Sequence, residues 1–210
     1  LPTKLDGSAM VANEGCAVVT NPTDNSVLFY TNGESIWNKN NQLMPNGQGL
    51  WGDESATQSA IVVPWPDSAC HFLVFAVHSA EGIVDGLYQW PSYSVVNMNL
   101  DGGLGDVSVK NQILMSDTVA EKLTSISDGS GGYWVMLHGF SRNSSLPRAK
   151  TFYAFHVTHA GIAGTPVSTN IGTAHSTAVG TPFEMQGEMD FSPDGTKIGC
   201  AIRSSTNGRA

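Results

Sequence analysis

The sequence contains few charged residues, and cationic side chains are the scarcest of them. Lys and Arg together number 10 among 210 residues, Asp and Glu number 18, and the formal net charge is −8 at pH 7. No cluster of basic residues interrupts this acidic balance, so the chain lacks the positive patch of a protein that binds a phosphate backbone. We therefore expect no nucleic-acid partner.

Long hydrophobic runs are also missing. No stretch approaches the roughly eighteen apolar residues that span a bilayer, so no membrane span is expected. The opening residues, Leu1 to Lys4, do not contain the apolar core of a signal peptide. These observations leave three origins open: a cytosolic protein, a mature secreted product, or a fragment.

Cysteine is too rare for a disulfide scaffold. Cys16, Cys70 and Cys200 form an odd set without metal-ligand spacing. Cys16 and Cys200 lie in apolar strand patterns, where a buried free thiol is the ordinary interpretation and a disulfide is the less favoured alternative.

Catalytic and cofactor motifs are lacking as well. The G-x-S-x-G elbow of serine hydrolases does not occur, nor does a P-loop or a dinucleotide fingerprint. The histidines are dispersed, and no pair has the i, i+4 spacing of a helical zinc site. We therefore expect no metal and no cofactor.

Glycine and proline, by contrast, are plentiful, with 23 and 10 residues, and favour turns over long helices. The clearest pattern is a hairpin, in which Met189 to Phe191 and Lys197 to Ile202 flank the turn Ser192-Pro193-Asp194-Gly195. Similar turns centre on Asp24, Asp67 and Asp128. Blades of β-propellers recur at about 40 to 50 residues, and longer intervals between these turns are explained by inserted loops.

The second strand of each repeat predicts how the strands pack. The runs that begin at Val27, Phe72 and Tyr133 are apolar without alternation, as expected for strands covered on both faces. The segment from Pro45 to Ser55 is interpreted as a loop. We predict an all-β protein, a β-propeller in which three and a half to four blades of a larger, about seven-bladed ring are visible. Residues 1–210 then form one incomplete domain with units near 14–57, 58–115, 121–172 and 186–210.

An incomplete ring would expose an apolar blade face and a strand edge. We therefore expect the remaining blades to come from the same longer chain or from another polypeptide.

Several longer motifs resemble a known family: large secreted propeller proteins of gliding bacteria that use type IX secretion, often with PKD-like modules and a C-terminal sorting domain. The resemblance covers nearly the whole chain in order. Its motifs are Glu14-Gly15-Cys16-Ala17, Leu28-Phe29-Tyr30-Thr31-Asn32-Gly33, Ile36-Trp37-Asn38, Met44-Pro45-Asn46-Gly47, Thr57-Gln58-Ser59-Ala60-Ile61-Val62-Val63-Pro64, Gly102-Gly103-Leu104-Gly105-Asp106-Val107 and Glu121-Lys122-Leu123-Thr124.

The resemblance implies an extracellular or outer-surface location and a role in adhesion or surface assembly, with a protein or a glycan as partner. It supplies no agreed catalytic residues. The family's opening strand and its closing blades and sorting domain have no counterpart between Leu1 and Ala210, which again suggests a fragment.

Polar residues that precede the first strands are the first candidates for a site. Glu14, Gln58 and Glu121 lie before the first strands of successive units, where they could converge at one mouth of a central channel. Converging carboxylates bind a cation or act as acid and base. In the alternative interpretation, these side chains hydrogen-bond backbone groups of adjacent blades and lock the ring.

Histidine and tryptophan supply further candidates. His138 follows the second strand of its unit, as His78 does, and the two residues could meet at one rim. Trp51 and Trp90 lie in predicted loops, where they either stack on sugars or fill gaps between blades.

The leading hypothesis for function is a non-catalytic, extracellular propeller module of a bacterial surface protein that acts as a scaffold or adhesin. One alternative is a glycan-cleaving enzyme or lyase that uses Glu14, Glu121 and His138 at the channel mouth, because propeller sites assemble from separate blades without a local motif. Another is a lectin-like carbohydrate binder that uses the loop tryptophans.

Overall fold

Antiparallel sheets dominate the computed structural model, which describes residues 6–176 and 183–203. The all-β prediction is confirmed: in this part of the chain, helix is limited to the short α1 (Ala80–Asp85) and the 3-10 turns η1 (Asp101–Gly103), η2 (Pro147–Lys150) and η3 (Phe183–Met185). None of these described helices is long and apolar enough to cross a membrane.

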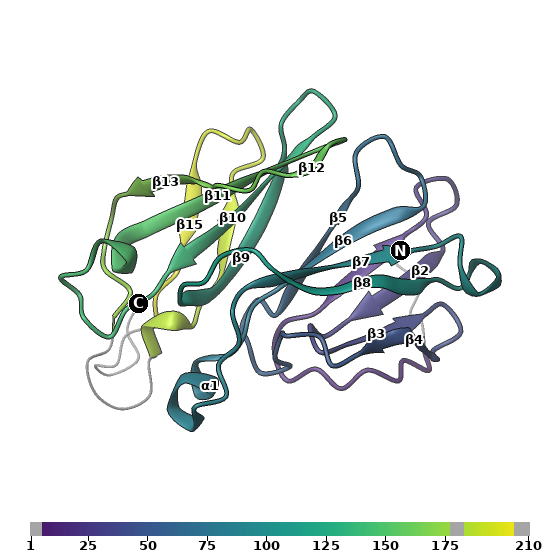
Figure 1. The fold of residues 1–210 in the computed structure, drawn as a ribbon, viewed down its shortest axis with the longest axis horizontal. Helices are drawn as coiled ribbons and strands as arrows, with labels where there is room; N and C mark the ends of the chain where they lie inside the picture. Colours follow the sequence, from purple (N-terminus) through teal and green to yellow (C-terminus); the bar gives the residue numbers. More distant parts are fainter. Residues whose placement is uncertain (1–5, 177–182, 204–210) are drawn as a thin grey trace.

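The strands form four sheets in which consecutive strands pair with each other, except that β13 pairs with β11 and not with β12 (Figure 1). The first sheet contains β1 (Ala17–Thr20), β2 (Val27–Thr31), β3 (Ser35–Asn38) and β4 (Leu43–Gln48). The second contains β5 (Ala60–Pro64), β6 (His71–Ala76), β7 (Ser92–Asn97) and β8 (Asp106–Ile113). The third contains β9 (Val119–Ser127), β10 (Tyr133–Gly139), β11 (Thr151–Thr158), β12 (Gly161–Ile162) and β13 (Val167–Asn170), the last two both paired with β11. The fourth contains β14 (Met189–Phe191) and β15 (Ile198–Cys200).

Aspartate organises the predicted turns through its side chain. In three of them the carboxylate accepts a hydrogen bond from the backbone N–H two residues ahead. This bond takes the place of a backbone–backbone hydrogen bond that the turn does not form. The pairs are Asp24 with Ser26 (2.9 Å), Asp128 with Ser130 (2.7 Å) and Asp194 with Thr196 (3.1 Å). Hydrogen bonds from Ser192 and Thr196 lower the pKa of Asp194 to about 2, because they stabilise its ionised form.

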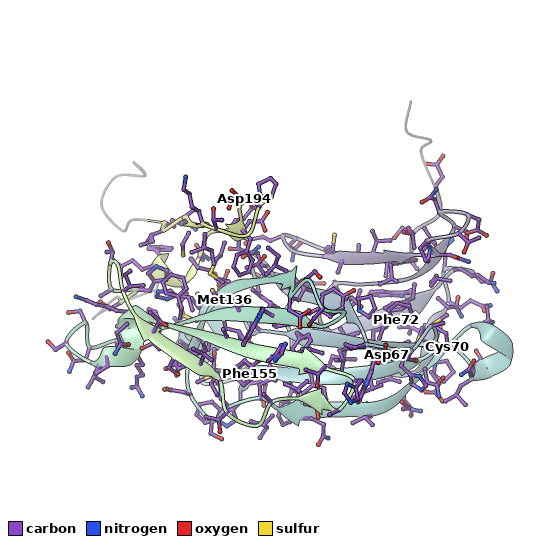
Figure 2. All side chains as sticks on the ribbon, turned by 90° about the horizontal axis from the view of Figure 1, so that it is seen from above. Asp67, Cys70, Phe72, Met136, Phe155 and Asp194 are labelled. Carbon is purple, nitrogen blue, oxygen red and sulfur yellow. The ribbon has the colours of Figure 1, made fainter. Side chains whose placement is uncertain are left out.

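The core lies between the sheets, and β6 has both of its faces buried. Phe72 and Val74 pack with Phe29 of the first sheet in one cluster, whereas Leu73 and Phe75 belong to a second cluster with residues of the third sheet. The Phe29 and Phe72 rings meet edge-on with centroids 5.4 Å apart, and Figure 2 shows Phe72 between the layers. The prediction of a strand covered on both faces is confirmed for β6, whereas Trp134 and Met136 of β10 are half-buried and line a cavity.

The first strands of the sheets lie beside one another. β1 contacts β5, β5 contacts β9, and β9 contacts β14, while the outer strands β4 and β8 also meet. Residues at the start of each sheet are thereby brought next to residues of the following sheet.

The segment expected to be a loop from Pro45 contains a strand instead. β4 pairs with β3 through Trp37 opposite Leu43 and Ser35 opposite Gln48, with a bulge between the two pairs. Within its sheet β4 is the last strand, where Pro45 removes no ladder hydrogen bond. The glycine and proline signal was therefore wrong here because an edge strand tolerates both residues.

The interpretation of the cysteines needs a correction too. All three thiols are free, but Cys16 is exposed and Cys200 is half-buried. Cys16 directly precedes β1, whose residues alternate between exposed and half-buried, so one face of this strand is open to solvent.

Candidate functional site

Glu121 on β9 is completely buried and connects three parts of the chain. Its Oε2 accepts hydrogen bonds from the backbone N–H (2.8 Å) and the hydroxyl (2.9 Å) of Thr57, and its Oε1 accepts one from the N–H of Ala80 (2.5 Å). Burial raises the pKa of Glu121, and these three donors oppose the rise because they stabilise the carboxylate. Glu121 thus holds the start of α1 and the segment before β5 against the third sheet.

Gln58 makes a second connection from the same segment. Its Oε1 accepts hydrogen bonds from the N–H of Leu123 (3.2 Å) and of Met189 (2.8 Å), and its Nε2 donates to the carbonyl of Met189 (3.1 Å). One amide side chain therefore links the segment before β5 to β9 and β14. For Gln58 and Glu121 the contacts are those of the second interpretation, namely hydrogen bonds to backbone groups of neighbouring sheets.

Lys122 follows Glu121 and is equally buried. Its Nζ donates to the carbonyls of Met185 (2.9 Å) and Gln186 (2.6 Å), just before β14. Burial lowers the pKa of Lys122 to about 8, although the nearby Cys200 and Glu121 favour the charged form. An uncharged amine still has two N–H donors, so both hydrogen bonds survive when the proton is lost.

The titration of Lys122 predicts a rise in stability at alkaline pH. The unfolded chain keeps the proton up to about pH 10.5, whereas the folded chain releases it near pH 8. Relative to Lys122→Met, the free energy of unfolding should rise by about 3 kcal/mol across this interval. Urea unfolding at several pH values measures it. The exposed Lys197→Met is the matched control, and parallel curves for the wild type and Lys122→Met would contradict the prediction.

His138, on β10 of the third sheet, stacks on His175, which lies in the segment after β13. The ring centroids lie 3.6 Å apart, and the Nδ1–H of His138 donates to the carbonyl of Gly139 at 2.7 Å. The Nδ1 of His175 is buried without a hydrogen-bond partner among the described residues, and its Nε2 lies 3.9 Å from Sγ of Cys200. Burial lowers the pKa of His138 to about 4, and burial together with the neighbouring His138 and Lys122 lowers that of His175 further.

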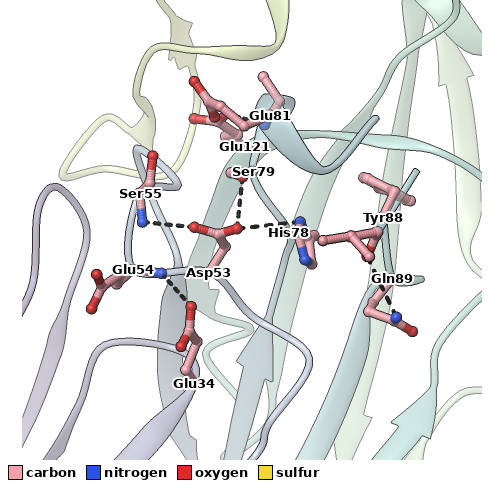
Figure 3. Close-up of polar contacts among 12 residues, drawn as sticks. Glu34, Asp53, Glu54, Ser55, His78, Ser79, Glu81, Tyr88, Gln89 and Glu121 are labelled. Carbon is pink, nitrogen blue, oxygen red and sulfur yellow. Dashed lines mark hydrogen bonds and ion pairs between the residues drawn. The ribbon is translucent and has the colours of Figure 1, made fainter. Parts of the chain in front are cut away.

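Asp53 forms the centre of a polar group beside α1 (Figure 3). Its Oδ2 accepts a hydrogen bond from the hydroxyl of Ser79 at 2.7 Å, and Nδ1 of His78 lies 3.5 Å from the same oxygen. The backbone N–H of Ser55 donates to the other oxygen. Because Ser79 donates to the carboxylate and not to the histidine, this group lacks the nucleophile–base contact of a hydrolase.

The remaining sequence-predicted residues lie in different surroundings. Glu14 has an exposed side chain, in contrast to the buried Glu121. Trp51 is half-buried, and its backbone N–H donates to the side chain of Asn111 at 3.2 Å. Trp90 is 39% exposed and meets Tyr88 edge-on at 6.4 Å. The structure thus joins Gln58 and Glu121 in one network, whereas Glu14, Trp51 and Trp90 make contacts of other kinds.

Sequence reasoning missed two members of these groups. Asp53 lies in the segment interpreted as a loop, and Lys122 was quoted only within a motif. The one signal that could have identified a buried amine is the position of this lysine within the strand-like run Val119–Thr124, all of which is buried in the structure. Within the described residues, no three His, Cys, Asp or Glu side chains are placed to bind one metal ion.

The buried groups of this region are hydrogen-bonded mainly to backbone atoms, which suits them to hold the sheets together. Glu121, Gln58 and Lys122 together use carbonyl and N–H partners on four segments. No protein-family model matches this chain, and neither a curated protein nor a solved structure is significantly similar to it.

Proposed function

We propose that the chain is a non-catalytic β-propeller module of an extracellular bacterial surface protein, where it acts as a scaffold or adhesin. Two features support the propeller arrangement: the strands of each sheet follow chain order apart from β13, and the first strands of successive sheets contact one another. Blades of a propeller have this order and this contact.

The hydrogen bonds of the polar residues support a role without catalysis. A general acid or base needs a proton site within reach of a substrate. Both carboxylate oxygens of Glu121 are occupied by Thr57 and Ala80, and its side chain is completely buried. Asp53 is similarly engaged by Ser79 and Ser55.

The outer face of the third sheet supports the proposal that the chain acts as a scaffold. A cavity of about 390 Å³ opens between β10, β11, β13 and Ile198 of β15, and its lining is almost entirely apolar. It is lined by Trp134, Met136, Phe152, Ala154, Val167, Thr169, Ile171 and Ile198. On its other face, the third sheet packs against the four-stranded second sheet. On the face with the cavity, its neighbour is the fourth sheet, which has two described strands, β14 and β15. We expect further strands, from a longer chain or from another polypeptide, to cover this face.

The location and size of the native polypeptide test this proposal. Intact cells of the source organism are treated with a protease, and the released peptides and the native mass are determined by mass spectrometry. We expect peptides of this chain in the released fraction and a native polypeptide or complex larger than the 22.2 kDa of this sequence. A 22.2 kDa monomer confined to the cell interior would reject the proposal.

A glycan and protein array distinguishes binding from turnover. The proposal expects binding without a change in the ligand's mass. Cleavage of a glycan by the wild type that is lost in Glu14→Gln, a change at an exposed carboxylate that leaves the fold intact, would favour the enzyme instead.

A further inference from the structure

The open edge of β15 leaves the fourth sheet shorter than its neighbours. The first and second sheets contain four strands each, whereas β15 pairs only with β14 among the described residues. Where the first and second sheets meet, even their outer strands β4 and β8 are in contact, and Nδ2 of Asn46 donates to Oδ1 of Asp106 at 2.9 Å. The junction of the third and fourth sheets begins in the same way, with β9 against β14, but no described strand follows β15.

Backbone groups of β15 point toward this open edge. In an antiparallel pair, residues that bond to the partner strand alternate with residues whose N–H and C=O groups point away from it. The N–H of Ala201 donates to the carbonyl of Glu188 at 2.8 Å, so Gly199 also bonds toward β14. The N–H and C=O groups of Ile198 and Cys200 therefore face the open edge.

The apolar cavity on the outer face of the third sheet lies beside this edge, because Ile198 is part of its lining. The rest of the lining comes largely from alternate residues of single strands, which lie about 7 Å apart on one face of a sheet. Val167 and Ile171 at its rim are 59% and 62% exposed. These alternate residues are Trp134 and Met136 of β10, Phe152 and Ala154 of β11, and Val167 and Thr169 of β13.

The second sheet shows how a third strand fits such an edge. The N–H of Met98 donates to the carbonyl of Cys70 at 2.8 Å, so the backbone groups of Phe72 and Val74 on β6 bond to β7 by the same alternation. The side chains of Phe72 and Val74 pack toward the preceding sheet, as that of Ile198 does. Residues that pair directly across two strands lie on the same face. A strand added to β15 would therefore direct the same residues to β15 with their backbone and into the cavity with their side chains.

The described part of the chain does not return to this edge. After β15 it continues beside the segment that precedes β14, because the N–H of Arg203 donates to the carbonyl of Gln186 at 3.3 Å. A small apolar ligand would fill the cavity but would leave the backbone groups of Ile198 and Cys200 without partners. A polypeptide strand satisfies both the cavity and the edge.

We propose that β15 accepts an antiparallel strand of a partner polypeptide, whose apolar residues at alternate positions fill the cavity of the third sheet. In this mode of recognition, main-chain hydrogen bonds supply affinity and the cavity selects the side chains. The inference names the partner of the scaffold role and rests on the proposed function to that extent. The binding test uses the purified chain, so its failure is separate from a failure of the cell-surface test.

The probe is the peptide Lys-Thr-Val-Thr-Leu-Thr-Val-Thr-Lys, titrated into the isotope-labelled chain and followed by NMR. We expect the amides of Ile198 and Cys200 to become protected against hydrogen exchange, whereas the amide of Gly199, which already faces β14, should not change. N-methylation of the two valines removes N–H groups that are directed at β15 and should weaken binding about tenfold. N-methylation of the two threonines beside the leucine removes N–H groups on the opposite edge and is the matched control, with unchanged affinity.

A charge in the cavity tests the part played by its side chains. Met136→Lys should weaken binding of the unmodified peptide at least tenfold, and Val167→Lys at the exposed rim replaces it if that variant fails to fold. Val18→Lys adds the same charge to an exposed position of β1 and is the control. Unchanged affinity of the valine-methylated peptide would mean apolar burial without strand pairing and would overturn the proposal. Full affinity in the folded cavity variant would also overturn it, as would protection of Ile198 and Cys200 without peptide, because the chain would then cover its own edge.

Discussion

Acidification from about pH 6.5 to about pH 4 is expected to remove most of the protein's stability. His138 and His175 are buried as neutral rings, and burial lowers the pKa of both, that of His138 to about 4. In the unfolded chain both rings bind protons below about pH 6.5. The unfolded state therefore gains protons before the folded state does, so stability is present above this pH and is lost as the pH falls.

The magnitude of this effect decides whether the fold survives. Both histidines stay neutral in the folded chain down to about pH 4. Acidification from about pH 6.5 to about pH 4 therefore lowers the free energy of unfolding by roughly 6 kcal/mol. Total stabilities of domains lie at about 5 to 15 kcal/mol. We therefore expect unfolding near pH 4 to 5, apart from any contribution of carboxylates.

Urea unfolding followed by tryptophan fluorescence between pH 7 and pH 4 measures this loss. The double variant His138→Leu/His175→Leu should start less stable at pH 7, because the carbonyl of Gly139 loses its partner, but should show a flatter pH dependence. His159→Gln at an exposed position is the matched control. The same slope in the wild type and the double variant would refute the role of the buried pair.

Local signals were sufficient for most strands and turns. The strand Met189–Phe191 was predicted with its observed bounds, and the runs predicted to begin at Val27 and Tyr133 do begin there, because apolar β-branched and aromatic runs bounded by turn residues depend on few other parts of the chain. β4 was not predicted, because Pro45 and Gly47 are typical of a loop. Pairing with β3 nevertheless keeps both residues in an edge strand. The short α1 has six residues, too few for a helical period to be recognised.

The polar contacts were less accessible to sequence reasoning. Gln58 and Glu121 were identified by their place before the first strands, but their partners could not be named. Gln58 reaches Met189, 131 residues away, and Glu121 reaches Ala80, 41 residues away. Such contacts depend on how the sheets pack, which no local pattern records.

Replacement of Glu121 by alanine is expected to lower the free energy of unfolding by about 3 to 5 kcal/mol. The N–H groups of Thr57 and Ala80 would each lose their acceptor in a buried position, as would the Thr57 hydroxyl, at about 1 to 3 kcal/mol for each unpaired group. The removed side chain would also leave a cavity. Because Thr57 precedes β5 and α1 connects β6 to β7 of the second sheet, their release should loosen the junction between the second and third sheets.

Glu121→Gln separates the contribution of the charge from that of the shape. The amide fills the same volume and its oxygen still accepts hydrogen bonds on one side, but in either orientation its NH₂ group faces a backbone N–H, that of Thr57 or that of Ala80, and an N–H can only donate. We expect this variant to lose nearly as much stability as Glu121→Ala, because an N–H donor then faces another N–H donor where the carboxylate oxygen accepted a hydrogen bond. Glu14→Ala, at an exposed carboxylate, is the control and should change stability by less than about 0.5 kcal/mol. If Glu121→Ala and Glu14→Ala unfolded at the same urea concentration, the buried carboxylate would not hold the sheets together, and a role for Glu121 beyond the fold would have to be sought.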